Sequence, residues 1–212
     1  MRGRDLVSID DLAPAELTGI LDRAAELKRA AQAGRPTPVL AGKTLAMIFE
    51  KPSLRTRVTF EVGMRQLGGG AVVLAPADIQ LGTRESVPDV ARNLSRWVDG
   101  IMARTFAHRT VVDLAASASV PVINGLSDWE HPCQILADLL TVREHLGRLD
   151  GVRIAWVGDG NNVLHSLLLG AAKVGTSVTA ATPAGRGPAA AGVRRAPPHA
   201  PGTGGPLLLT AP

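Results

Sequence analysis

Strand-like and helix-like runs alternate along this chain from residue 44 to about residue 181, and this order restricts its fold more than any other feature. The expected strands are residues 44–49, 71–75, 100–103, 120–123, 152–157 and 177–181, and the expected helices are residues 14–33, 54–67, 86–98, 108–118, 131–146 and 161–174. A strand, helix, strand order requires crossover connections, which are right-handed and join parallel strands. The sequence therefore predicts an α/β fold, with a parallel sheet that carries helices on both faces.

The pattern divides the chain into three parts. Residues 1–147 are expected to form one α/β domain, and residues 148–182 the start of a second, Rossmann-like α/β domain. Residues 183–212 are rich in Pro, Ala, Gly and Arg and have no apolar period, so we expect an unstructured tail there. With only two strands and one helix, the second domain would leave apolar surface of that helix exposed.

The distribution of charge, the lack of long apolar runs and the single cysteine limit the classes of function that fit this chain. The net charge is +4, and three of these charges are arginines of the tail, Arg186, Arg194 and Arg195, so the body of the chain carries only about +1. No aromatic residue accompanies these arginines, which disfavours a nucleic-acid-binding tail. No apolar run reaches the ~20 residues of a membrane span and the first residues do not resemble a signal peptide, so we expect a cytoplasmic protein. Cys133 stands alone and is expected to be a buried apolar side chain without chemistry.

Polar side chains follow each expected strand of the first domain. Ser53 to Arg57 follow the first strand, Gln80 the second, Arg104 and Thr105 the third, and Asn124 and Gly125 the fourth, with His131 and Gln134 beyond them. In open parallel sheets, ligands bind at the carboxyl ends of the strands. The sequence therefore predicts a site for an anion and a small carbonyl or amide group at this edge.

The segment from Glu50 to Arg57 is dense in anion-binding groups. Ser53 is placed to cap the following helix, whose first backbone N–H groups have no partner within the helix. Arg55 and Arg57 fall in the first turn, where the positive end of the helix dipole disfavours cations unless an anion binds there. Guanidinium groups bind phosphate through two parallel hydrogen bonds. These residue types together favour a phosphate-binding turn.

These residues resemble a known family. The carbamoyltransferases carry the pattern Ser-Thr-Arg-Thr-Arg, and this chain has Ser53-Leu54-Arg55-Thr56-Arg57, departing only at Leu54. Three further segments are similar to the ornithine branch rather than the aspartate branch: Phe49-Glu50-Lys51-Pro52, His131-Pro132-Cys133-Gln134 and Gly158-Asp159-Gly160-Asn161-Asn162. The resemblance covers about residues 5 to 182. It implies transfer of the carbamoyl group from carbamoyl phosphate to ornithine, without a metal ion or a cofactor.

The resemblance also implies a role for each site residue. Carbamoyl phosphate would be bound by Ser53, Leu54, Arg55, Thr56, Arg57, Gln80, Arg104, His131 and Gln134. Arg104 and His131 would be catalytic, because both would stabilise the charge that grows on the carbonyl oxygen. Gln80 would reach the site of a neighbouring subunit in a homotrimer. Asn162 would hold the amino-acid end of ornithine.

Alternatives remain open for the function. The family has an Asp…Ser-Met-Gly loop and a Cys-Leu-Pro loop in its second domain, and this sequence contains neither. We therefore expect a chain that is truncated or frame-shifted after about residue 182. A non-catalytic remnant that binds carbamoyl phosphate or associates with full-length subunits is one alternative. A carbamoyltransferase for another amino acid is a second.

Overall fold

The computed structural model describes residues 3–189 and 208–210 of the chain. These residues form two compact units, of which one contains residues 3–7 and 24–128 and the other residues 8–23, 129–189 and 208–210. Helix α1 (Pro14–Gln32) contributes to both units. The predicted domain boundary at residue 147 stays a prediction.

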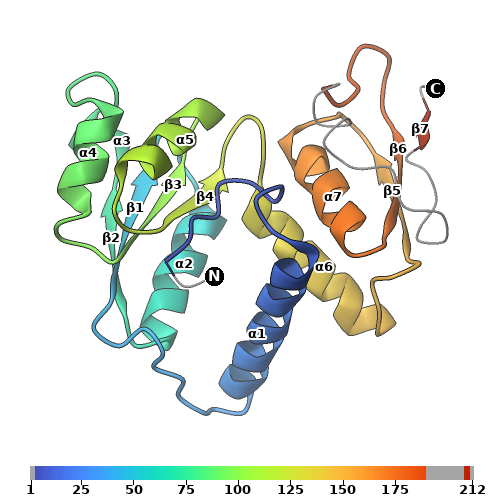
Figure 1. Cartoon of the computed structure of the whole chain (residues 1–212), viewed down its shortest axis with the longest axis horizontal. Helices are drawn as coiled ribbons and strands as arrows, with labels where there is room; N and C mark the ends of the chain where they lie inside the picture. Colours follow the sequence, from blue (N-terminus) through green and yellow to red (C-terminus); the bar gives the residue numbers. More distant parts are fainter. Residues whose placement is uncertain (1–2, 190–207, 211–212) are drawn as a thin grey trace. The chain divides into compact units, whose positions relative to one another are not determined.

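The first unit is built on a four-stranded parallel sheet with the order β2-β1-β3-β4 (Figure 1). Its strands are β1 (Thr44–Phe49), β2 (Gly70–Leu74), β3 (Gly100–Arg104) and β4 (Val122–Leu126), and its other helices are α2 (Leu54–Gln66), α3 (Pro76–Ile79), α4 (Val87–Leu94) and α5 (His108–Ser117). The parallel sheet that the alternation predicts is thereby confirmed.

Side chains of β1 alternate between the two faces of this sheet. Ala46 and Ile48 pack with buried residues of α4 and α5, whereas Leu45, Met47 and Phe49 pack with residues of α2. A period of two places successive side chains on opposite faces, so both faces of a buried strand need cover. The prediction of helices on both faces is therefore confirmed.

Most elements lie within one residue of their predicted bounds, and the larger differences concern β4, α4 and α3. The fourth strand is β4, so Asn124 and Gly125, expected in the loop after it, lie inside it. Pro121 has no N–H and therefore cannot donate a hydrogen bond to a neighbouring strand. Only its carbonyl takes part, by accepting from Ile101 N at 2.9 Å. The helix α4 ends at Leu94, four residues before the predicted end, and the short helix α3 was not predicted.

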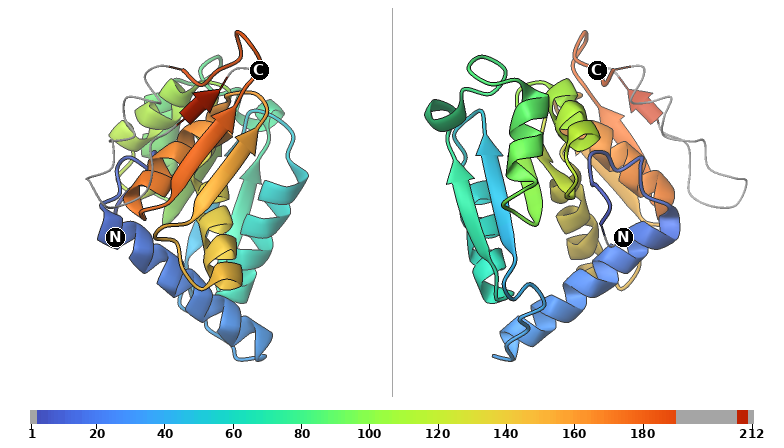
Figure 2. Two further views of the ribbon diagram at one scale, coloured as in Figure 1. Left: turned by 90° about the vertical axis from the view of Figure 1, so that its right-hand side faces the viewer. Right: turned by 60° about the vertical axis from the view of Figure 1, so that its left-hand side comes forward.

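The second unit has a three-stranded parallel sheet with the order β5-β6-β7, which Figure 2 shows in its left-hand view. Its elements are α6 (Pro132–Leu146), β5 (Arg153–Val157), α7 (Asn162–Lys173), β6 (Ser177–Ala181) and β7 (Leu208–Thr210). The start of a second α/β domain is confirmed. The strand β7 lies in the segment predicted to be unstructured, so that prediction is wrong at these three residues; residues 190–207 and 211–212 lie outside the described part.

The helix α7 is buried, in contrast to its predicted exposure. All residues from Leu164 to Ala171 are buried, and α7 packs on both α6 and β6. Gly170 permits the close approach of α6, since a Cβ atom there would lie 2.9 Å from Cγ2 of Ile135. The second unit therefore covers this apolar helix with α6, which the sequence assigns to the first domain.

No helix among the described residues is long and apolar enough to cross a membrane.

Candidate active site

The turn between β1 and α2, residues 50–57, is called the phosphate turn from here on. Ser53 is the N-cap of α2 with extended backbone angles (φ −153°, ψ 116°), but its hydroxyl does not cap the helix. The first turn of α2 contains no acidic residue. Ser53 thus occupies the predicted N-cap position without the capping hydrogen bond, which leaves its hydroxyl and the first N–H groups of the helix as donors for the anion that the sequence leads us to expect.

Arg104 ends β3 and points at this turn. Its Nη1 donates to Oγ1 of Thr56 at 3.1 Å, and its Nε is buried without a hydrogen-bond partner. Burial lowers the pKa of Arg104, and the nearby charge of Arg55 lowers it further. Among the described residues neither Arg104 nor Arg55 makes an ion pair. Two unneutralised guanidinium groups thus lie close together beside a helix N-terminus, which favours a bound anion.

The other members of the motif are more exposed. The guanidinium of Arg57 lies 4.0 Å from the Glu61 carboxylate one helical turn later, so this arginine is partly neutralised by its own helix. The Leu54 side chain is 76% exposed, so this residue offers a ligand its backbone N–H rather than a side-chain group. The structure brings Ser53, Leu54, Arg55, Thr56, Arg57 and Arg104 together in the first unit, as the sequence predicts.

Two residues of the phosphate turn were assigned no role from sequence. The ammonium of Lys51 lies 5.1 Å from the ring centroid of Phe106, and burial followed by the charge of Arg104 lowers the pKa of Lys51. The carboxylate of Glu50 accepts from Phe106 N at 2.6 Å, and Glu50 N donates to Arg104 O at 2.9 Å. Glu50 thus ties the phosphate turn to the loop after β3. Their place in the sequence, three and two residues before Ser53, was the available signal.

Gln80 lies in the same unit and ends α3. Its backbone is left-handed (φ 44°, ψ 53°), and its carbonyl accepts from Thr83 N and Arg84 N, both at 2.9 Å. A non-glycine residue in this region is uncommon and marks a tightly determined turn. Gln80 lines a pocket together with Glu50 and Phe106. Its role toward a neighbouring subunit stays a prediction.

The remaining predicted residues belong to the second unit. His131 is the N-cap of α6, and its backbone N–H donates to Oγ of Ser166 at 2.9 Å. The side-chain amide of Gln134 donates to Oδ1 of Asp138 at 2.9 Å, which leaves the amide oxygen as an acceptor. Asn162 is the first residue of α7, next to Asn161, whose side chain caps that helix by accepting from Val163 N at 3.0 Å.

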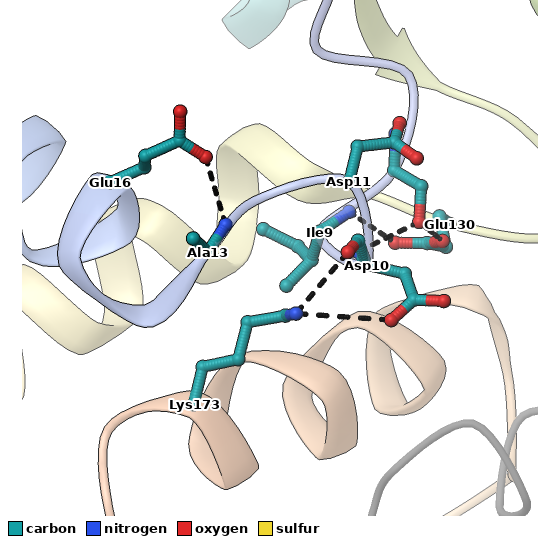
Figure 3. A network of polar contacts seen from close by, with 8 residues as sticks. Ile9, Asp10, Asp11, Ala13, Glu16, Glu130 and Lys173 are labelled. Carbon is teal, nitrogen blue, oxygen red and sulfur yellow. Dashed lines mark hydrogen bonds and ion pairs between the residues drawn. The ribbon is translucent and has the colours of Figure 1, made fainter.

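A buried carboxylate precedes His131, and sequence reasoning missed it. Glu130 is fully buried and accepts hydrogen bonds from Oγ of Ser8, from Ile9 N at 3.0 Å and from Oγ of Ser166 at 3.0 Å. Figure 3 shows its carboxylate facing the segment around Ile9. Burial raises the pKa of Glu130, and the hydrogen bonds oppose that rise without cancelling it. An isolated glutamate before a histidine has no feature in the sequence that indicates that its carboxylate is buried.

The raised pKa of Glu130 predicts a pH dependence of stability. Its ordinary pKa is 4.5, and the folded chain holds the proton to a higher pH than the unfolded chain does. The contribution of Glu130 to the free energy of unfolding is therefore complete below pH 4.5 and decreases as the pH rises through the folded-state pKa. Urea denaturation from pH 4.5 to 8 should show wild type losing stability relative to Glu130→Gln over this range. A pH-independent difference would contradict the prediction.

No group of three or more metal-ligating side chains that could hold a metal ion occurs in the described part of the chain.

Comparison with known proteins gives matches over nearly the whole sequence. Residues 4–144 match the family model of the aspartate/ornithine carbamoyltransferase carbamoyl-P binding domain. Residues 150–211 match the family model of the Asp/Orn binding domain, so the similarity continues beyond residue 182, where the resemblance was expected to end. The two matches meet between residues 144 and 150.

Individual relatives agree with the family models. An ornithine carbamoyltransferase of Carboxydothermus hydrogenoformans is 59% identical over 187 residues, which are 88% of this chain and 60% of the relative. One of Pyrococcus horikoshii is 51% identical over 209 residues, or 99% of this chain and 66% of the relative. The solved ornithine carbamoyltransferase of Pyrococcus furiosus has a TM-score of 0.95 and 49% identity, covering 99% of this chain and 67% of that one. The chain thus spans about two thirds or less of the length of these relatives.

Proposed function

We propose, because the chain belongs to the aspartate/ornithine carbamoyltransferase family, that its phosphate turn binds carbamoyl phosphate and that the carbamoyl group passes to the side-chain amine of ornithine. The products are citrulline and phosphate. The acceptor is inferred from relatives named ornithine carbamoyltransferase and from the segments typical of that branch. Arginine biosynthesis and arginine catabolism both use this reaction, and the proposal covers either.

One observation carries the phosphate part of the proposal. Arg104 buries an unpaired Nε beside Thr56, and the N-terminus of α2 offers further donors, with no acidic residue in its first turn. A buried donor without an acceptor costs about 1–3 kcal/mol, and more when it is charged. A phosphate oxygen placed there would remove that cost. The free chain therefore carries a cation and a donor that a dianion would satisfy.

The proposed chemistry follows from these donors. The neutral ornithine amine attacks the carbonyl carbon and negative charge develops on the carbonyl oxygen. The C–O bond to phosphate then breaks with its electron pair going to phosphate, which also takes up the proton that the amine loses. Arg104 would donate to both the phosphate and the carbonyl oxygen, and His131 would donate to the carbonyl oxygen. Each such donor contributes a few kcal/mol to the transition state. Gln134 would accept from the carbamoyl NH₂ with its amide oxygen, which Asp138 leaves open.

Further parts of the proposal concern assembly and location. Gln80 would complete the site of a neighbouring subunit in a homotrimer, Asn162 would hold the amino-acid end of ornithine, and the protein would act in the cytoplasm. The carbamoyl-phosphate site is proposed to lie in residues 1–147 and the ornithine site in the residues after them. Sedimentation of the chain, with and without carbamoyl phosphate, tests the trimer.

Calorimetry with carbamoyl phosphate, followed by an assay for citrulline, tests the proposed function. We expect saturable binding of carbamoyl phosphate, competition by inorganic phosphate, and citrulline formation with ornithine but no product with aspartate. Binding without citrulline would favour the non-catalytic alternative for this chain. Product with aspartate would favour another acceptor. Absence of binding at millimolar carbamoyl phosphate would refute the site itself.

A further inference from the structure

Glu130 joins three stretches of the second unit that are distant in the sequence. Its carboxylate accepts from Ser8 and Ile9 of the N-terminal segment and from Ser166 of α7, while Glu130 itself lies two residues before the start of α6. The same N-terminal segment is held again by Lys173, whose Nζ donates to Asp10 O at 3.2 Å (Figure 3). Burying a carboxylate is costly, so three converging donors mark a specific arrangement rather than a general core contact.

Ser166 connects this carboxylate to His131. Its Oγ is fully buried, donates its one hydrogen to Oε2 of Glu130 and accepts from His131 N at 2.9 Å. Because the hydroxyl has a single hydrogen, the bond to Glu130 aims its lone pairs at His131. The N–H of an N-cap residue has no partner inside its own helix, so Ser166 is its acceptor here. The backbone at His131 is therefore fixed through Ser166.

We propose that Glu130 is a positioning residue for His131. The carboxylate orients the Ser166 hydroxyl, and that hydroxyl fixes the N-cap backbone from which the His131 imidazole projects. This inference rests on the proposed role of His131 toward the carbonyl oxygen of carbamoyl phosphate. A displacement of a catalytic donor by a fraction of an ångström weakens its hydrogen bond, so the support is part of the site.

A matched pair of substitutions isolates this connection. Glu130→Gln keeps the shape but has no charge and one acceptor oxygen in place of two, so the hydrogen bonds made to this side chain, including that from Ser166, become weaker. Ser166→Ala removes the connecting hydroxyl alone. Lys173→Met is the control, because the Lys173 ammonium holds the same N-terminal segment at Asp10 and makes no hydrogen bond or ion pair with Glu130, Ser166 or His131 among the described residues.

Amide hydrogen exchange, resolved by residue in NMR spectra, is the first measurement. We expect the His131 amide to exchange about tenfold faster in Glu130→Gln and in Ser166→Ala, while the amide of Leu139 in the middle of α6 changes less than twofold. Lys173→Met should leave His131 unchanged. Equal acceleration at His131 and Leu139 would show a merely structural role, and unchanged His131 exchange in both variants would overturn the connection. If Glu130→Gln does not fold, Ser166→Ala alone decides.

Binding of carbamoyl phosphate is the second measurement. Glu130→Gln and Ser166→Ala should weaken binding about three- to tenfold, less than His131→Ala, and the control should not change it. If wild type does not bind carbamoyl phosphate, the proposed function fails while the exchange result still decides whether Glu130 fixes His131. If His131→Ala weakens binding and Glu130→Gln does not, the positioning role fails and the proposed function stands.

Discussion

Replacing Arg104 by alanine is expected to weaken the binding of carbamoyl phosphate by about 1.5–3 kcal/mol, or roughly ten- to a hundredfold. The guanidinium is charged, half-buried and without an ion pair among the described residues, and its Nε has no acceptor until an anion binds. Arg104→Ala therefore removes a charge-assisted hydrogen bond from the complex with carbamoyl phosphate. In the chain without a ligand, it breaks no ion pair among the described residues. Isothermal titration calorimetry measures the difference.

Two variants control for charge and for geometry. Arg109→Ala removes the same charge five residues away, where the arginine is 80% exposed and pairs with Asp113 at 2.7 Å, and should leave affinity within twofold. Arg104→Lys keeps the charge but loses the planar fork, so we expect it to recover only part of the affinity. An Arg104→Ala affinity within twofold of wild type would remove the phosphate assignment from this edge of the sheet.

Alkylation of Cys133 is expected to be about a thousandfold slower in the folded chain than in urea at pH 8. Burial raises the pKa of the thiol from 9.0 to about 12, although the residue as a whole retains some exposed surface. Only the thiolate reacts, and three units of pKa change its fraction by about a factor of a thousand. Mass spectrometry after timed iodoacetamide treatment gives both rates.

A surface thiol provides the comparison for this experiment. The chain has one cysteine, so Ala31→Cys in a Cys133→Ser background places the only thiol on an exposed position of α1. That thiol should react at similar rates in the folded and unfolded chain. If Cys133 reacts in the folded chain as fast as this surface thiol does, its burial and its lack of chemistry are both wrong.

Much of the fold could be predicted because each element carries its own local signal. Short apolar runs separated by amphipathic helices indicated the parallel strands, and residues 44–49 and 177–181 were predicted with their observed bounds. The errors in the predicted strands occur where a segment distant in the sequence pairs with the strand. At the start of β4, Val122 N donates to Oδ1 of Asp5 at 2.7 Å, and β7 is paired with β6. Neither partner is near in the sequence.

The residues of the candidate site likewise divide into those that were predicted from the sequence and those that were missed. The phosphate turn was predicted because its serine, threonine and arginines are consecutive, so one helix start brings them together whatever the rest of the chain does. Glu130 was missed because its donors come from residues 8, 9 and 166, and its burial depends on all of them. Lys51 was given no role because its contact with Phe106 crosses from one strand end to the next.

The amino-acid sequence by itself predicted the order of the elements from α1 to β6 except α3, the parallel sheets and the gathering of Ser53, Thr56 and two arginines at one helix start. Each of these depends on hydrogen bonds and side-chain periods that are local to a few residues. Only the tertiary structure decided that Arg104 joins Thr56, that α7 is buried against α6 and β6, and that a carboxylate at Glu130 is enclosed next to His131. The physical reason is that burial and the pairing of buried charge are properties of the surrounding chain, and the surroundings exist only after distant segments have packed together.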